Sequence, residues 1–334
     1  MERRKVQLTG GSTFTVSIPK EWAREHEITA GEEVAFHPDN GSLLMTPVST
    51  SGPTRGVMDI AGREGDALMR GVMTMYVSGF DEIELTADRI TPAQRRVIRE
   101  ATQGLVGLEV LEETADTVVI QDLLDSAELS VHSAVQRMHL IARSMLEDAV
   151  LALRDHDLDL AMDVVTRDDD VDRLWYVVSR IFRGTLRSPE MASEIGITRE
   201  NCFDYHSSAR QLERVADHAA KISQVTREMD EPVPEEVGES LEALREDATD
   251  IIETAFEALF ADDSEEATRL ANEARAKVAE IDDQARVIDD QLRELDPARA
   301  RHLGLIVDSL SRSGDYGGNI AETALQKAAP APDP

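Results

Sequence analysis

Apolar residues recur every three to four positions from about residue 128 to residue 329, which predicts an all-helical region. Its breaks, which divide it into six long helices, are His156-Asp157, Ser188-Pro189, Pro232–Pro234, Asp262–Ser264 and Asp296-Pro297. The second half repeats the first, since RQLERVADHAAKIS at 210–223 corresponds to SLSRSGDYGGNIAE at 309–322. The pattern predicts tandem three-helix bundles, about 128–229 and 233–329, with SPEMASEIGIT at 188–198 as an extra loop.

Ahead of the helices, the spacing of apolar positions is typical of strands. Residues 1–50 predict a small β-rich domain, with a Gly-Gly turn in KVQLTGGSTFTVSIP, a short helix from Lys20 to about Glu27, and a hairpin whose four-residue turn runs from Pro38 to Gly41. A β-unit of this size is marginal as an independent core, so we expect it to dimerise. The stretch STSGPTRG at 49–56 is expected to be a linker.

Residues 57–125 alternate strands and helices in the order βαβαββ, which predicts a small α/β sandwich. This block contains neither a Gly-rich phosphate loop nor a nucleophile in a recognisable setting, so its pattern assigns it no function. The fold class expected for the whole chain is therefore multidomain α+β, with the blocks 1–50, 57–125 and 128–329.

The formal net charge is −31, from 66 acidic and 35 basic residues, of which only 5 are Lys. Such self-repulsion is best tolerated where salt screens it, so we expect a protein adapted to molar salt in the cytoplasm of a halophile. Cys202 is the only cysteine, which excludes an internal disulfide and fits a reducing compartment. No apolar run reaches the length of about 18 residues that a membrane span needs.

Two carboxylates in the segment 210–223 raise the question of a metal site. Glu213 and Asp217 lie about 40° apart on a helix, on the flank of an apolar face. Carboxylates at this spacing repel, and a hard cation would relieve the repulsion. In a chain this acidic, however, the pattern by itself favours a solvated face, and it is the repeat that favours a site. The second copy has Ser311 in place of the glutamate, and its Gly314, Gly317 and Gly318 predict close helix packing.

Residue patterns bear on two further classes of site, a di-iron site and a DNA-binding site. None of the eight histidines has a glutamate three residues before it, which argues against a di-iron bundle enzyme. Residues 1–24 hold five basic residues against two acidic ones, a local net charge of +3. This basic edge is consistent either with a reader of the DNA backbone or with ordinary solubility and salt-bridge charges.

Taken together, these segments resemble known families. GGSTFTVSIPKEWAREHEITAGEEVAFHPDNGSLLMTP resembles an AbrB/SpoVT-type swapped-hairpin domain over about residues 3–48. LERVADHAAKI, RDDDVDRL and GDYGGNIAE are similar to segments of the PhoU family of phosphate uptake regulators, whose two three-helix bundles carry E(D)xxxD motifs. RGVMTMYVSGFDEIEL and VGLEVLEE resemble the middle region of archaeal members of that family.

The resemblance implies a non-enzymatic regulator of phosphate homeostasis that restrains a phosphate ABC transporter and its signalling. It also implies a divalent metal or iron at carboxylates of the E(D)xxxD motifs. The first bundle has more of these carboxylates than the second. The expected metal ligands are Asp168, Asp172, Glu213 and Asp217 in the first bundle and Asp282 and Asp315 in the second.

AbrB-type domains bind DNA as dimers, so the resemblance implies a homodimer that contacts promoter DNA. The residues expected at DNA are Arg3, Arg4, Lys5, Ser12, Thr13, Lys20 and Arg24. Two alternatives remain open. One is a protein–protein regulator of the transporter or of a signalling kinase, in which the N-terminal domain only dimerises. The other is a carboxylate-metal enzyme, which the missing Glu-x-x-His and the lack of a nucleophile disfavour.

Overall fold

The computed structural model describes residues 3–39, 41–48, 54–123 and 130–330, and it divides into two compact units. The small unit lies within Met1–Gly52 and the large one within Pro53–Asp333. The sequence predicts three blocks, and the structure packs the second and third of them together in the large unit. The expected linker lies mostly outside the described residues, which resume at residue 54.

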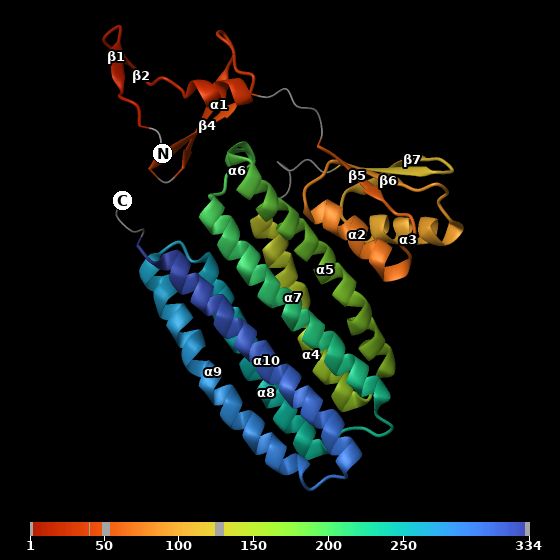
Figure 1. The fold of residues 1–334 in the computed structure, drawn as a ribbon. Coiled ribbons are helices and arrows are strands. Elements are labelled where there is room, and N and C mark those ends of the chain that lie inside the picture. The colour runs from red at the N-terminus through yellow and green to blue at the C-terminus, as the bar shows by residue number, and fades with distance from the viewer. Residues whose placement is uncertain (1–2, 40, 49–53, 124–129, 331–334) are drawn as a thin grey trace. The chain divides into compact units, whose positions relative to one another are not determined.

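The small unit consists of two hairpins and one helix (Figure 1). Strands β1 (Gln7–Thr9) and β2 (Thr13–Thr15) pair antiparallel, helix α1 spans Lys20–Glu25, and β3 (Val34–Asp39) pairs antiparallel with β4 (Ser42–Pro47). The predicted four-residue turn is wrong, because Asp39 pairs with Ser42 and Pro38 with Leu43. A two-stranded ladder has only edge strands, so it tolerates Pro38, which lacks a backbone donor.

The small unit has almost no core of its own. Within its described residues only His37 is buried, at 8% exposed. Eight large apolar side chains are instead exposed to solvent, namely Val6, Leu8, Phe14, Val16, Ile18, Phe36, Leu43 and Val48. Phe14, at 75%, is the most exposed of them. A single copy of the unit therefore leaves these apolar side chains in contact with water.

The large unit begins with the predicted α/β sandwich, in the predicted order βαβαββ. Its elements are β5 (Arg55–Asp59), α2 (Gly65–Val77), β6 (Glu82–Thr86), α3 (Pro92–Gln103), β7 (Leu108–Glu113) and β8 (Thr117–Asp122). The strand order is β5-β6-β8-β7, with β5 and β6 parallel and the other pairs antiparallel. Helices α2 and α3 cover one face of this sheet, and Leu68, Val72 and Ile98 enter its core (Figure 1).

The helical region contains the six predicted long helices. They are α4 (Val131–Asp155), α5 (Leu158–Arg187), α7 (Arg199–Glu228), α8 (Glu235–Phe260), α9 (Ser264–Leu292) and α10 (Pro297–Ala328). The predicted breaks are confirmed, and Asp157, Asp263 and Asp296 cap three of the helices through their side chains. The stretch expected to be an extra loop contains a short helix, α6 (Pro189–Glu194), which the side chain of Ser188 caps.

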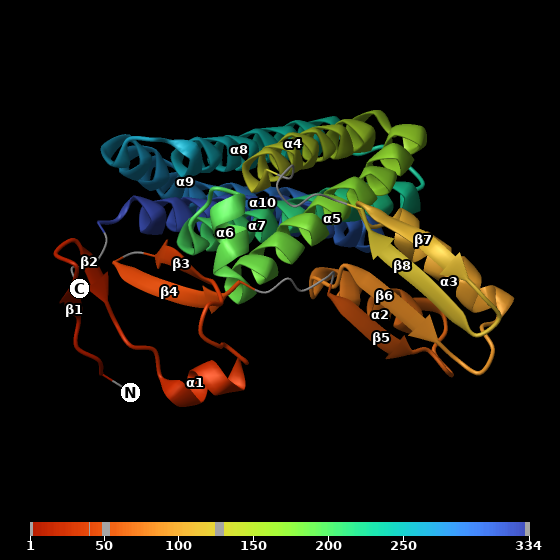
Figure 2. The same ribbon diagram turned by 90° about the horizontal axis from the view of Figure 1, so that it is seen from above.

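Helices α4, α5 and α7 form one three-helix bundle and α8, α9 and α10 form the other (Figures 1 and 2). The two bundles meet mainly where α7 packs against α10 and α4 against α8, and one continuous apolar core runs through both. Among the described residues, none of the helices combines the length and apolarity needed to cross a membrane.

Gly314, Gly317 and Gly318 of α10 lie at close helix contacts, as predicted. A Cβ on Gly317 would lie 2.8 Å from Cγ2 of Ile251 and 3.0 Å from the backbone nitrogen of Ile252, both on α8. A Cβ on Gly318 would lie 2.9 Å from Cγ2 of Val278 on α9. The conformational cost of glycine in a helix is thus offset by close approach of the neighbouring helices.

Candidate functional site

The first candidate site is formed by four carboxylates on two packed helices. Asp168 and Asp172 lie one turn apart on α5, and Glu213 and Asp217 lie one turn apart on α7. Burial raises the pKa of Asp168 to about 7 and of Asp172 to about 6, and the charges of Asp217 and of neighbouring aspartates add to the effect. The structure therefore brings all four predicted ligands of the first bundle into one electrostatic group, which we call the α5–α7 carboxylate group.

Glu213 is the buried member of this group, at 7% exposed. Burial, and then the charge of Asp217, raise its pKa to about 7 although Arg210 opposes the change. Its Oε1 accepts a hydrogen bond from Nη1 of Arg210 at 2.6 Å, whereas its Oε2 is buried without a hydrogen-bond partner. A solvated face is therefore the wrong description of this glutamate.

The chemistry of the group suits a hard cation, because all four donors are carboxylate oxygens and one of them is an orphaned buried acceptor. The placement is less suitable. Across the part of the chain that the structure describes, no three His, Cys, Asp or Glu side chains are positioned to hold one metal ion. The α5–α7 carboxylate group thus carries excess negative charge. Protonation, the guanidinium of Arg210 or an added cation can reduce that charge.

In the second bundle, arginines lie close to the carboxylates. Nη1 of Arg312 lies 3.6 Å from Oδ2 of Asp315, and Nη2 of Arg275 lies 3.0 Å from Oε1 of Glu322. Burial raises the pKa of Asp315, while Arg312 lowers it and Asp282 raises it further. Asp282 and Asp315 are therefore close enough to interact, but arginines already supply positive charge there, in the bundle that lacks the glutamate.

The predicted DNA-binding residues all belong to the small unit. Lys20 opens α1, Arg24 lies in its last turn, and Thr13 opens β2. All seven side chains, of Arg3, Arg4, Lys5, Ser12, Thr13, Lys20 and Arg24, are exposed. They are thus accessible, on a unit that exposes most of its apolar side chains.

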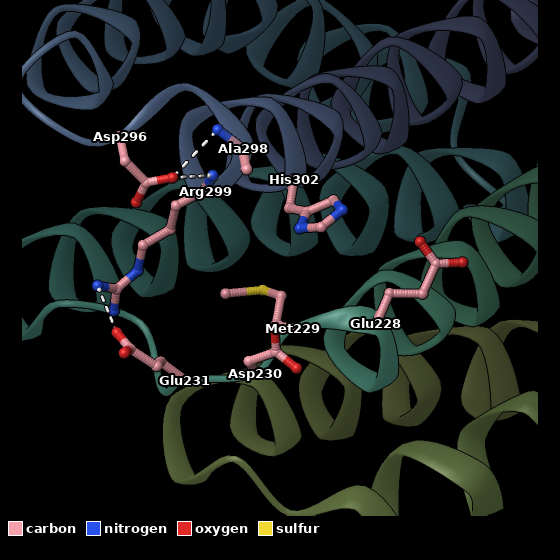
Figure 3. Close-up of a pocket in the computed structure, with 8 residues that line it drawn as sticks. All are labelled: Glu228, Met229, Asp230, Glu231, Asp296, Ala298, Arg299 and His302. Atoms are coloured by element: carbon pink, nitrogen blue, oxygen red, sulfur yellow. Dashed lines mark hydrogen bonds and ion pairs between the residues drawn. The ribbon is translucent and has the colours of Figure 1, made fainter.

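A separate pocket of about 220 Å³ lies where the α7–α8 connection meets the start of α10 (Figure 3). Asp296 accepts hydrogen bonds from the backbone of Ala298 and Arg299, and the guanidinium of Arg299 reaches Glu231 and the carbonyl of Pro232. His302 completes the lining, with Glu228, Met229 and Asp230. Its polar contacts serve to cap α10 and to join the two repeats, so we assign it a structural role.

The contacts of Arg180 were not predicted from the sequence. Arg180 lies in the apolar run of α5, at 8% exposed, and joins the helix to the α/β sandwich. Its Nη1 donates to the carbonyls of Tyr76 at 2.6 Å and Phe80 at 3.1 Å, and its Nη2 lies 2.6 Å from Oδ2 of Asp122. An arginine between Val177, Val178 and Ile181 was the available signal, because a charge at a core position needs a buried partner.

Comparison with known domains identifies two regions. Residues 135–226 match the model of the PhoU domain, and residues 7–52 match that of MazE, an antidote–toxin recognition protein and bacterial antitoxin. Comparison with curated proteins finds no match.

The solved structures similar to the chain include two PhoU proteins. The phosphate transport system regulatory protein PhoU from Streptococcus pneumoniae is 18% identical, with 58% of this chain and 91% of that chain covered and a TM-score of 0.48. PhoU from Pseudomonas aeruginosa is 23% identical, with 60% of this chain and 96% of that chain covered and a TM-score of 0.45. The domain matches confirm the resemblance to PhoU proteins over residues 135–226 and the resemblance to a MazE/AbrB-like domain over residues 7–52.

Proposed function

We propose that this protein is a non-enzymatic regulator of phosphate uptake that works in a salt-rich cytoplasm. The observation that carries the proposal is the PhoU domain match at residues 135–226, within a fold of two tandem three-helix bundles. The helical half would sense phosphate status and the small unit would act on promoters of transport genes. The test is expression of phosphate-transport genes in a deletion strain during phosphate sufficiency, where loss of regulation is expected to raise it.

The small unit is proposed to work as a homodimer. Eight large apolar side chains are exposed on a unit of about fifty residues that buries only His37 among its described residues. A second copy of the same unit is the occupant that every chain can supply, and a two-fold arrangement covers the same patch on both partners. Dimerisation would also double the basic edge of the unit.

DNA binding is proposed through the exposed basic side chains of the small unit. Phosphate contacts supply affinity that falls steeply with salt, so the assay must be done at several salt concentrations. The experiment is a gel shift on transport-gene promoters with wild type and Arg4→Ala/Lys5→Ala. Arg286→Ala/Arg293→Ala, which removes the same charge from exposed positions of the bundles, is the matched control. Genome-wide binding profiles with and without phosphate limitation then identify the regulon.

The second candidate function is a protein–protein regulator of a phosphate ABC transporter or of a signalling kinase, with a small unit that only dimerises. The net charge of −31 favours it through the molar salt that such a charge leads us to expect, because electrostatic binding to DNA phosphates weakens steeply as salt rises. Dimerisation without any promoter enrichment would support this alternative over DNA binding.

A metal at the bundles is proposed as part of sensing. Asp168, Asp172, Glu213 and Asp217 would have to move closer together to hold a divalent cation or iron, since no three described side chains are positioned for one ion. Asp282 and Asp315 would be a poorer second set. The bound cation would supply positive charge where carboxylates repel. Elemental analysis of purified wild type should find metal that Glu213→Ala/Asp217→Ala lacks, and equal trace metal in both would contradict the proposal.

A further inference from the structure

A cavity of about 350 Å³ lies between the α/β sandwich and α5, and its lining shares only Asp172 with the α5–α7 carboxylate group. One wall comes from α2 and from α3 with the residues that follow it, and the other wall comes from α5. The lining residues are Met69, Met73, Glu100, Ala101, Gln103, Gly104, Leu105, Asp169, Asp172, Arg173 and Tyr176. A cavity of this size between two structural blocks is of the kind in which small ligands bind.

The two walls are held together by contacts next to the cavity. Arg180, one turn beyond Tyr176 on α5, binds the carbonyls of Tyr76 and Phe80 and the carboxylate of Asp122. Arg187, two turns further, donates to the carbonyl of Ser78. These two arginines of α5 thus bind backbone carbonyls at and just after the C-terminal end of α2. Because the walls are fixed before any ligand arrives, little ordering is needed on binding.

The charge on the cavity wall is negative and only partly compensated. Glu100 lies on the sandwich side, Asp169 and Asp172 lie on the α5 side, and Arg173 is the single basic residue. Nη1 of Arg173 lies 3.6 Å from Oδ1 of Asp170, a residue that does not line the cavity. The three carboxylates therefore present an excess of negative charge to whatever occupies the space.

The remaining lining is apolar and aromatic. Met69, Met73 and Leu105 belong to the sandwich, and the first two pack against its core. Tyr176 of α5 also packs against that core and lines the same cavity as the methionines. Thioether and aromatic groups adapt to the body of an organic ligand, and an aromatic face attracts an ammonium group. A bare metal ion would leave this apolar wall unused.

We infer that the cavity binds a small organic amine, with the ammonium group on the side of Asp169, Asp172 and Glu100 and the apolar body against Met69, Met73 and Tyr176. Positive charge and apolar surface in one molecule match the two halves of the lining. The inference does not depend on phosphate regulation, because the sandwich supplies half of the site and Asp169 and Glu100 lie outside the α5–α7 carboxylate group.

The test uses the full-length protein and phenethylamine as the probe, followed by isothermal titration calorimetry at about 2 M KCl, where non-specific charge attraction is screened. The variants are Asp169→Asn and Glu100→Gln, both at exposed positions, which protects the fold. Glu280→Gln on α9 is also exposed and is the matched control. We expect one amine per chain, about tenfold weaker binding in each cavity variant, and no change in the control.

Three outcomes would overturn the inference. The first is the absence of saturable binding. The second is equal binding of 2-phenylethanol, which has the same body without the charge. The third is binding that magnesium chloride abolishes and that Asp169→Asn and Glu100→Gln leave unchanged, since the amine would then occupy the α5–α7 carboxylate group. None of these results bears on the gene-expression test of the proposed function.

Discussion

Nη2 of Arg180 lies 2.6 Å from Oδ2 of Asp122, and both side chains are more than nine-tenths buried. This pair connects α5 of the first bundle with the last residue of strand β8. Removing Arg180 takes away the guanidinium that compensates the buried charge of Asp122. We therefore expect Arg180→Met to lower the free energy of unfolding by about 3–5 kcal/mol, measured by urea denaturation followed by circular dichroism.

The matched control for Arg180 is Arg286→Met on α9, which removes an exposed partner of Asp283. Exposed ion pairs contribute roughly 0–1 kcal/mol, so this variant should unfold nearly as wild type does. Equal destabilisation in the two variants would show that the buried pair has no special role.

The α5–α7 carboxylate group predicts a dependence of stability on pH. Burial and mutual repulsion raise the pKa of Asp168 and of Glu213 to about 7, above the range of an unfolded chain. The folded state therefore binds protons that the unfolded state has already lost, and its stability should fall as the pH rises from about 4 to about 7. Glu213→Gln should flatten this part of the profile of Tm against pH and raise Tm at pH values above about 7.

The control for the pH profile is Glu280→Gln, at an exposed position of α9. It should reproduce the wild-type profile. A wild-type slope of the opposite sign between these pH values, or a Glu213→Gln profile identical to wild type, would contradict the assigned direction.

Two glycines of α10 predict opposite effects of alanine. A Cβ on Gly317 would press on the backbone of Ile252, which cannot move aside cheaply, so Gly317→Ala should cost about 1–3 kcal/mol. A Cβ on Gly304 meets nothing within 4 Å, so Gly304→Ala should gain up to about 1 kcal/mol from helix propensity. Thermal unfolding of the two variants checks the pair, and a gain at position 317 would contradict the close packing of α10 on α8.

The exposed apolar residues of the small unit predict a dimer that a double substitution weakens. Phe14 is 75% exposed and Leu43 is 62% exposed. Replacing both by Ser removes apolar area that a second copy would cover, at about 25 cal/mol per Å² lost, so the dissociation constant should rise at least tenfold. Sedimentation analysis measures it, with Leu140→Ser, at a position that is 61% exposed on α4, as the control. A monomeric wild type would contradict the proposed homodimer.

Much of the fold could be predicted because its signals are local. The apolar period of the helices, the capping aspartates and the prolines lie within a few residues of the boundaries that they set. The same holds for the inward face of α7, where Leu212, Val215 and Ala216 are fully buried. The grouping of Asp168 and Asp172 with Glu213 and Asp217 could also be anticipated, because the resemblance to PhoU proteins relates the two helices.

The predictions from sequence were wrong where contacts with residues distant in the sequence decide the local structure. The turn of the second hairpin is shorter than expected because Asp39 pairs with Ser42, a register that the whole ladder sets. Glu213 is buried because α7 is covered on more than its apolar stripe, since it packs against α4, α5 and α10. Helical angle alone places that glutamate on a flank and cannot show how many helices surround it.

The sequence by itself determined the helices, the order of strands along the chain and the duplicated bundle, since each follows from spacing and capping within one segment. Only the tertiary structure decided that Arg180 meets Asp122, 58 positions earlier, and that a cavity with Met73 on one wall and Asp169 on the other lies beside that pair. The physical reason is that burial and electrostatic pairing depend on which surfaces meet, and a distant partner leaves no periodic trace in the chain.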